Sequence, residues 1–160
     1  MNNIEQQKVI FGSIFLLANR LQTVGDRYLG EGGITTKQWF LTVMVSQFKD
    51  KPPTLSEVAE LMGSSRQNVK QIALKLEEKG FLKIEKDARD SRAFRIRLTE
   101  KCRKFWEDRE EQDNNYIGEF FKDLTDEEIT ATSSSIKKLI DKVERMGKQY
   151  DSKTDSDEED

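Results

Sequence analysis

The sequence predicts a mainly α-helical chain with one small β-hairpin, and three observations carry this prediction. Two short helical patterns meet at a Gly-Ser turn at residues 63 and 64. On both sides of a charged turn, the stretch 81–98 alternates apolar with charged residues, as a hairpin with one buried face does. Long amphipathic helical patterns cover about 4–29 and 99–148. The fold class expected from these patterns is a winged helix-turn-helix domain, over about 35–98, with N- and C-terminal dimerisation helices.

The first predicted helix, over about 4–29, has apolar residues around more of its circumference than one core-facing stripe requires. This distribution predicts two buried faces. The tract GEGG at 30–33 should stop the helix. Thr35 or Thr36 can then cap a second helix, and Pro52 with Pro53 should end it.

The helix-turn-helix itself is predicted from two capping patterns in succession. Thr54 is followed three residues later by Glu57, which is a capping box, and Gly63 should close the short helix that this box opens. Ser64 with Gln67 repeats the pattern at the start of the next helix. Residues 54–80 taken alone leave an ordinary helical hairpin with a glycine cap as the alternative.

The hairpin that follows has strands at 81–86 and 92–98. Its inward residues are expected to be Leu82, Ile84, Phe94, Ile96 and Leu98, and its outward residues Lys83, Glu85, Arg95 and Arg97 should form cross-strand pairs. In the turn, Asp87 and Asp90 are expected to neutralise and brace arginines. At least one guanidinium at the tip should remain free to reach outward.

Two further helices complete the expected chain. Thr99 can cap the first, and a capping box from Thr125 to Glu128 can open the last, whose apolar stripe runs from Ile129 to Met146. Residues 1–150 are expected to form one domain. Residues 151–160 carry six acidic side chains and one lysine with nothing apolar to bury, which predicts a disordered tail.

Composition argues against several classes of protein. The chain of 160 residues has no histidine and one cysteine, so it lacks the residues for a Ser-His-Asp or Cys-His catalytic centre, a Cys/His zinc site or an intrachain disulfide. We therefore expect no enzyme, no cofactor and no bound metal, although carboxylate-only catalysis and a carboxylate-rich metal site stay open. The single thiol, the absence of a membrane-spanning apolar run and the lack of a basic signal region predict a cytoplasmic protein with no membrane partner.

Charge is distributed unevenly. The formal net charge is −3, but residues 1–150 carry 26 basic and 24 acidic side chains once the acidic tail is set aside. Within 64–104 there are 13 Lys and Arg residues against 6 Asp and Glu. Such a cluster is typical of a surface that binds a polyanion, although a merely solvated surface could look the same.

These residues resemble the MarR family of bacterial transcription regulators. The resemblance spans about 34–146 and rests on ITTKQWFLTVMV, on TLSEVAELMGSSRQNVKQIALKLEEKGF, on the wing DARDSR and on LTEKCRKFW. Its most specific element is Asp-x-Arg-Asp-x-Arg, met by Asp87, Arg89, Asp90 and Arg92. The resemblance implies a homodimer with interlocked first and last helices, a recognition helix in the major groove and a wing in the minor groove. Many members are repressors released by small aromatic or anionic ligands or by cysteine oxidation.

The expected partners are a second copy of the chain and double-stranded DNA, with a pseudo-palindromic operator whose half-sites lie about 34–36 Å apart. Arginine suits guanine, and asparagine or glutamine suits adenine, in the major groove. Ser64 is the expected helix cap near a phosphate, and Arg92 or Arg89 should enter the minor groove. The DNA-binding residues predicted in this way are Ser64, Ser65, Arg66, Gln67, Asn68, Lys70, Gln71, Arg89, Arg92 and Arg95.

A small aromatic or anionic effector is also expected. If the implied architecture holds, five aromatic residues meet between the dimer base and the DNA-binding lobe, and they are Tyr28, Trp39, Phe40, Phe105 and Trp106. Simple packing of these rings is the alternative. Cys102 is expected to be a small buried residue and not a redox sensor. We thus expect a homodimeric repressor relieved by a small molecule, with a winged-helix protein-interaction module that does not bind DNA as the alternative.

Overall fold

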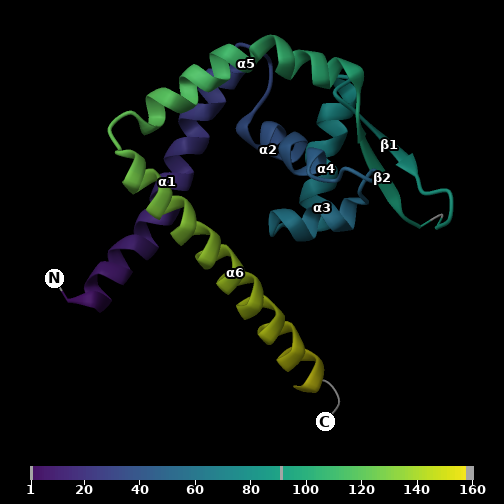
Figure 1. Cartoon of the computed structure of the whole chain (residues 1–160). Helices are drawn as coiled ribbons and strands as arrows, with labels where there is room; N and C mark the ends of the chain where they lie inside the picture. Colours follow the sequence, from purple (N-terminus) through teal and green to yellow (C-terminus); the bar gives the residue numbers. More distant parts are fainter. Residues whose placement is uncertain (1, 91, 158–160) are drawn as a thin grey trace. The chain divides into compact units, whose positions relative to one another are not determined.

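The computed structural model describes the backbone of residues 2–90 and 92–157 and the side chains of residues 2–90 and 92–149. Contacts divide the chain into two compact units, Met1–Asp108 and Arg109–Asp160, each of which is described by itself. The elements, in chain order, are α1 (Asn3–Gly30), α2 (Thr36–Ser46), α3 (Leu55–Met62), α4 (Arg66–Glu78), β1 (Leu82–Lys86), β2 (Phe94–Leu98), α5 (Glu100–Phe121) and α6 (Asp126–Asp157) (Figure 1). The expected fold class, mainly helical with one antiparallel hairpin, is confirmed.

Helices α3 and α4 form the helix-turn-helix, and its caps follow from the sequence. The hydroxyl of Thr54 accepts the Glu57 N–H at 3.1 Å, while the Thr54 N–H donates to the Glu57 carboxylate at 2.6 Å. Gly63 ends α3 with a φ of 60°, a left-handed conformation that glycine adopts without a steric penalty. Both predictions, the capping box and the glycine stop, are confirmed.

The predicted cap of α4 is wrong by one residue. Ser65, not Ser64, is the N-cap, and its hydroxyl accepts the Asn68 N–H at 3.2 Å. Ser64 belongs to the end of α3, because its own N–H donates to the carbonyl of Ala59 at 2.9 Å and completes a Schellman turn around Gly63. A residue engaged in closing one helix is therefore not the one that opens the next.

The end of α2 also differs from the prediction. The helix stops at Ser46, well before Pro52, because the N–H groups of Gln47 and Phe48 donate three residues back, to Met44 and Val45. Such short-range bonds tighten the last turn and end the helix without a proline.

The core of the first unit joins α2, α3, α4, the hairpin and the start of α5. Its fully buried side chains include Leu41, Leu55, Val58, Val69, Leu76 and Ile96. These positions recur at helical spacing on α3 and α4, so each helix has one buried face and one free face. One face of the helix-turn-helix thus packs against the core, and the opposite face is exposed to solvent.

The hairpin pairs β1 with β2 in an antiparallel register that sets Leu82 opposite Leu98 and Ile84 opposite Ile96. Leu82 and Ile96 are buried, as predicted for the inward face, whereas Ile84, Phe94 and Leu98 are half-buried. The segment before α3 lies along β2, since the Ile96 N–H donates to the carbonyl of Pro53 at 2.8 Å. This bond attaches the wing to the helix-turn-helix.

Helix α1 and helix α2 meet closely within the first unit. The Thr36 N–H donates to the Asp26 carboxylate at 2.7 Å, and the Thr36 hydroxyl donates to the carbonyl of Gln22 at 3.2 Å. A Cβ at Gly25 would lie 2.6 Å from the Thr36 hydroxyl oxygen. We call this contact the α1–α2 seam; it is close because residue 25 has no side chain.

The turn between α1 and α2 contains the predicted glycine stop. Gly33 has a φ of 71°, and a Cβ at Gly32 would lie 2.8 Å from the Phe105 ring at the start of α5. Lys79, at the end of α4, donates from its ammonium to the carbonyl of Gly33 and to the Gln38 amide oxygen. The turn is therefore held by both α4 and α5.

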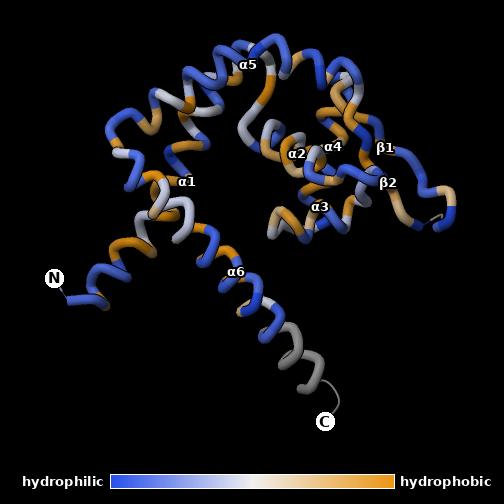
Figure 2. Tube along the Cα trace, in the orientation of Figure 1, coloured by the Kyte–Doolittle hydropathy of each residue, from blue (hydrophilic) through white to orange (hydrophobic). Residues whose placement is uncertain are grey.

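Apolar residues recur along α1 and α6 (Figure 2), and many of their side chains are exposed. On α1, Phe11 is 68% exposed and Phe15 is 60% exposed; on α6, Val143 is 65% exposed. The two buried faces expected for α1 are thus uncovered over residues 3–20 within this chain. Exposed apolar surface of this extent is unusual in a monomer.

Helix α6 extends further than the sequence suggests. It continues to Asp157, so residues 151–157 are helical where a disordered acidic tail was expected, and residues 158–160 lie outside the described residues. Residues 147–157 contain no proline, so backbone hydrogen bonding continues along the helix. The expectation of one domain over 1–150 stays a prediction.

Candidate nucleic-acid interface

The outward face of α4 collects most of the residues expected to touch DNA. Val69, Ala73 and Leu76 are buried against the core, so the opposite face of α4 is exposed to solvent. That exposed face presents Ser65, Arg66, Gln67, Asn68, Lys70 and Gln71, whereas Ser64 is only half exposed. Donor and acceptor groups of the kinds that read base edges are therefore displayed together from the first two turns of one helix.

Asn68 is oriented by its neighbour. Its amide nitrogen donates to the hydroxyl of Ser64 at 2.9 Å. An amide nitrogen carries two hydrogens, so this bond leaves a second N–H for another acceptor. Ser64, predicted as a DNA contact, thus also orients a side chain predicted to read a base.

The wing turn is organised by Asp87. Its carboxylate accepts the N–H groups of Arg89 at 2.8 Å and of Asp90 at 2.9 Å, and it also contacts the guanidinium of Arg95. Asp90 in turn accepts the N–H of Arg92 at 2.9 Å. The two backbone bonds, followed by the Arg95 contact, hold the pKa of Asp87 at about 2, below its usual 3.8.

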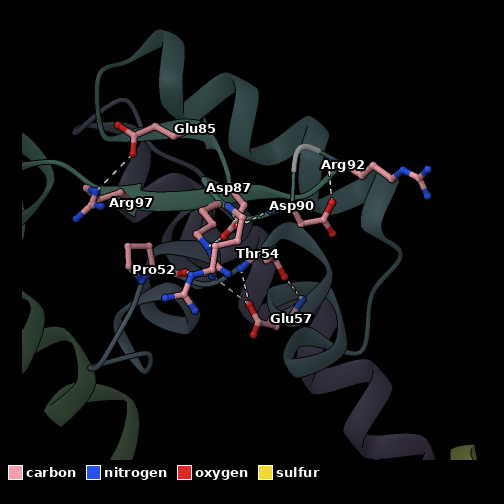
Figure 3. A network of polar contacts seen from close by, with 10 residues as sticks. Pro52, Thr54, Glu57, Glu85, Asp87, Asp90, Arg92 and Arg97 are labelled. Carbon is pink, nitrogen blue, oxygen red and sulfur yellow. Dashed lines mark hydrogen bonds and ion pairs between the residues drawn. The ribbon is translucent and has the colours of Figure 1, made fainter.

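Arg95 does not project into solvent as the strand alternation predicts. Besides Asp87, its guanidinium reaches the carbonyl of Pro52 at 2.6 Å and lies 3.8 Å from the Glu57 carboxylate. These three partner residues are labelled in Figure 3. The arginine side chain is only 20% exposed. Arg95 therefore joins the wing to the start of α3, a role that the sequence pattern did not reveal because Pro52 is 43 residues away.

Arg89 and Arg92 are placed differently. Both are exposed, and neither guanidinium forms a hydrogen bond or an ion pair with a residue that the structure describes. In Figure 3 the Arg92 side chain extends away from the contacts around Asp87. Asp87 and Asp90 thus bond the backbone of the turn, and Asp87 also bonds Arg95. They form no ion pair with Arg89 or Arg92. The sequence predicted that at least one arginine at the tip would remain free.

The five aromatic residues expected to line an effector site separate into groups. Phe105 packs edge-on against Trp106 with ring centroids 4.7 Å apart and against Phe81 at 5.0 Å. Trp39 and Phe40 lie 6.4 Å apart on α2 and are 36% and 38% exposed, while Tyr28 is half-buried. The cavities described here, of about 580 and 420 Å³, are lined by other residues. The indole N–H of Trp106 is buried beside the Cys102 thiol, whose sulfur is a weak acceptor for it.

The lone thiol sits in the core. Cys102 is fully buried, and burial raises its pKa above the usual thiol range. A buried, protonated thiol reacts slowly with oxidants, in keeping with the packing role expected for it. Within the described part of the chain, no group of three or more Cys, Asp or Glu side chains could hold a metal ion, and no helix is long and apolar enough to cross a membrane.

The fold and the exposed polar helix define the chain as a winged helix-turn-helix protein. No model of a known protein family matches it. A curated relative, the "Transcriptional activatory protein BadR" of Rhodopseudomonas palustris, is 26% identical over 144 residues, which cover 86% of this chain and 79% of the relative.

Solved structures extend the comparison, and several are described as MarR-family regulators. The Staphylococcus aureus MepR–DNA complex matches with a TM-score of 0.72 at 19% identity, covering 83% of this chain and 97% of that one. The organohalide-sensing regulator RdhR-CbdbA1625, bound to 2,4-dichlorophenol, matches with a TM-score of 0.75 at 18% identity, covering 91% and 88%. The chain thus has the fold of the MarR-family transcriptional regulators, as its resemblance implied.

Proposed function

We propose that this chain is a MarR-family transcriptional regulator that binds double-stranded DNA in a sequence-specific way. The observation that carries the proposal is the exposed polar face of α4. In the same unit, the wing presents Arg89 and Arg92, whose guanidinium groups have no partner among the described residues. A protein with this fold, MepR, was solved in a complex with DNA. Arg66, Gln67, Asn68 and Gln71 are the proposed base-reading residues, and Lys70 is a proposed phosphate contact. Arg89 and Arg92 are proposed to enter the minor groove.

The second part of the proposal is a homodimer. The exposed apolar residues of α1 and α6 need a cover, and a second copy of the chain supplies one with the same apolar composition. Two-fold symmetry would set the recognition helices about 34–36 Å apart, so we expect a pseudo-palindromic operator with half-sites one helical turn apart.

The third part is regulation by a small molecule. The relative RdhR-CbdbA1625 was solved in a form bound to 2,4-dichlorophenol, and Trp39 and Phe40 of this chain are partly exposed on α2. We propose that such a ligand binds near Trp39, Phe40 and Trp106 and relieves repression. The relative BadR is named as an activator, so repression by this chain needs a separate test. A promoter reporter, with and without the ligand, decides between repression and activation.

The experiment that tests the proposal selects bound sequences from random duplexes with the full-length protein. We expect a pseudo-palindromic consensus and an affinity that falls steeply with salt, because phosphate contacts release counterions. Recovery of no consensus, together with salt-insensitive binding to a protein partner, would support the interaction module instead.

A further inference from the structure

The two strands of the wing are bonded to the helix-turn-helix along both of their outer edges. Ile84 and Ile96 stand opposite each other in the hairpin. In an antiparallel pair, opposite residues either exchange backbone hydrogen bonds or direct their N–H groups outward. These two residues direct them outward, because the Ile96 N–H donates to the carbonyl of Pro53 at 2.8 Å and the Ile84 N–H donates to the Glu77 carboxylate at 2.7 Å. The first bond joins β2 to the segment before α3, and the second joins β1 to α4.

The bond from Ile84 to Glu77 differs from the bond to Pro53 in its acceptor. A carboxylate accepts a shorter and stronger hydrogen bond than a neutral carbonyl does. The bond is also partly sheltered from water, since Glu77 and Ile84 are both half-buried. Glu77 therefore gives β1 a strong attachment to α4.

The position of Glu77 within α4 is unfavourable for the helix itself. Helix α4 ends at Glu78, so Glu77 lies in the last turn, where the negative end of the helix dipole disfavours a carboxylate and favours lysine or arginine. Helix stability alone therefore does not account for a glutamate at residue 77, whereas the bond to Ile84 does.

Glu77 belongs to the same helix as the proposed base-reading residues. It follows Gln71 by six residues, which is about 9 Å along the helix axis. On the other side of the bond, β1 ends at Lys86, and Arg89 and Arg92 follow in the turn. One hydrogen bond thus connects the helix that presents the base-reading groups with the strand that leads to the tip arginines.

The contacts of Arg95 do not substitute for this bond. Arg95 joins the wing to Pro52 and Glu57, at the start of α3. Without the Glu77 carboxylate, the wing would stay attached to α3 and would lose the bond that sets its distance from α4 at Ile84.

We propose that Glu77 is a positioning residue for DNA binding. By holding the Ile84 N–H, it fixes the wing at the distance from α4 at which Arg92 enters the minor groove while Asn68 and Gln71 read the major groove. This inference rests on the proposed function. It adds that the contribution of the wing to affinity depends on a residue that does not itself contact DNA.

The bond itself is tested on the DNA-free, full-length protein by amide hydrogen exchange. Glu77→Ala should speed exchange at Ile84 at least about tenfold, because the N–H loses its acceptor, while exchange at Ile96 should change less than about twofold. If Glu77→Ala destabilises the whole fold, both amides exchange faster, and Glu77→Gln, which keeps a neutral acceptor, is compared instead. Equal exchange at Ile84 in the wild type and in both variants overturns the proposal.

The consequence for DNA is tested by a double-mutant cycle with an operator duplex. We expect Arg92→Ala to weaken binding at least about tenfold in the wild type and less than about threefold in Glu77→Ala, because a displaced wing no longer delivers the arginine. Asn68→Ala should weaken binding equally in both backgrounds. A general loss of stability would not lower the penalty of Arg92→Ala alone.

Glu78→Ala is the matched control, because it removes the adjacent, exposed carboxylate from the same end of α4. Removing either carboxylate changes the charge near DNA, so the penalty of Arg92→Ala is compared and not the affinity itself. That penalty should stay at least about tenfold in Glu78→Ala and should be partly restored in Glu77→Gln.

Three results would contradict the proposal. An Arg92→Ala penalty that is equal in the wild type and in Glu77→Ala overturns the positioning role and leaves the proposed function standing. An equally lowered penalty in Glu78→Ala assigns the effect to charge and overturns the role as well. Absence of sequence-specific binding by the wild type overturns the proposed function, and the positioning role with it.

Discussion

The guanidinium of Arg95 contacts the carboxylate of Asp87 on one side and the carbonyl of Pro52, at 2.6 Å, on the other. Asp87 closes the wing turn by accepting two backbone N–H groups, and Pro52 stands two residues before the cap of α3. One side chain therefore spans the distance between the wing turn and the helix-turn-helix. The sequence suggested a DNA contact for Arg95, and the two roles have different consequences on mutation.

Replacing Arg95 by Ala should lower the free energy of unfolding by about 1–3 kcal/mol, because it removes charged hydrogen bonds from a largely buried side chain and leaves Asp87 without its ion pair. Lysine at this position should recover only part of the loss, since one ammonium cannot replace the planar fork. Arg97→Ala, on the exposed face of the same strand, is the control and should change stability by less than about 0.5 kcal/mol. Chemical denaturation measures all three. If Arg95→Ala leaves stability unchanged and weakens DNA binding, Arg95 contacts DNA and does not brace the wing.

The wing turn should resist acid. Folding lowers the pKa of Asp87 from its usual 3.8 to about 2. A carboxyl whose pKa falls on folding stabilises the fold fully above its usual pKa, and that stabilisation is lost as pH falls through about 2. An NMR titration that follows the Asp87 carboxyl carbon and the Arg89 and Asp90 amides should therefore show a midpoint near 2. A midpoint near 3.8 would mean that the backbone bonds do not form in solution.

Replacing Arg92 by Ala should weaken operator binding at least about tenfold without changing the melting temperature. The guanidinium has no partner among the described residues and can enter a narrow minor groove, whose negative potential favours arginine. Arg89→Ala is the matched comparison at the other tip position. Fluorescence anisotropy with an operator duplex gives the affinities, and a fall in melting temperature alongside the loss would identify a structural role instead.

Substitutions on α4 should separate base reading from phosphate binding. Asn68→Ala or Gln71→Ala should each relax base preference at one symmetric pair of positions, with a loss of about 1–3 kcal/mol per contact. Lys70→Ala should weaken all sequences alike and reduce the slope of affinity against salt. Competition between operator and random duplexes distinguishes the two patterns, and a uniform loss for all three variants would contradict this division.

Truncation after Lys122 should give a monomer or an insoluble chain, because it removes the exposed apolar stripe of α6. Deleting residues 151–160 should leave the dimer intact. Sedimentation measurements on both chains decide the point, and a stable dimer ending at Lys122 would show that α6 is not required for pairing.

Local chemistry in the sequence was enough to place most of the elements. The capping box at Thr54, the glycine at 63 and the alternation of the hairpin each act within a few residues, and each is found where it was expected. The cap at Ser65 was missed because Ser64 and Ser65 have identical side chains, and only the turn closed by Ser64 distinguishes them. Continuation of α6 to Asp157 did not follow from the composition of the tail, because composition alone does not stop a helix.

The site was predictable in its composition but less so in its contacts. Exposure of the α4 residues follows from helical periodicity, since burial of Val69, Ala73 and Leu76 fixes the opposite face. The contact of Arg95 with Pro52 joins residues 43 positions apart in the chain. Tertiary packing brings such groups together, and no local pattern reports it.

The α1–α2 seam, where Gly25 lies against Thr36, sets the direction in which α1 leaves the DNA-binding lobe. From Gly25 to its first residue, Asn3, helix α1 is about 33 Å long. Over that length, a change of about 5° at the seam displaces the far end by about 3 Å. In a dimer paired through the far end of α1, a single added methyl group at residue 25 would thus alter the spacing of two recognition helices. A substitution at Gly25, which contacts Thr36 within the same chain, would therefore change the preferred spacing of the operator half-sites.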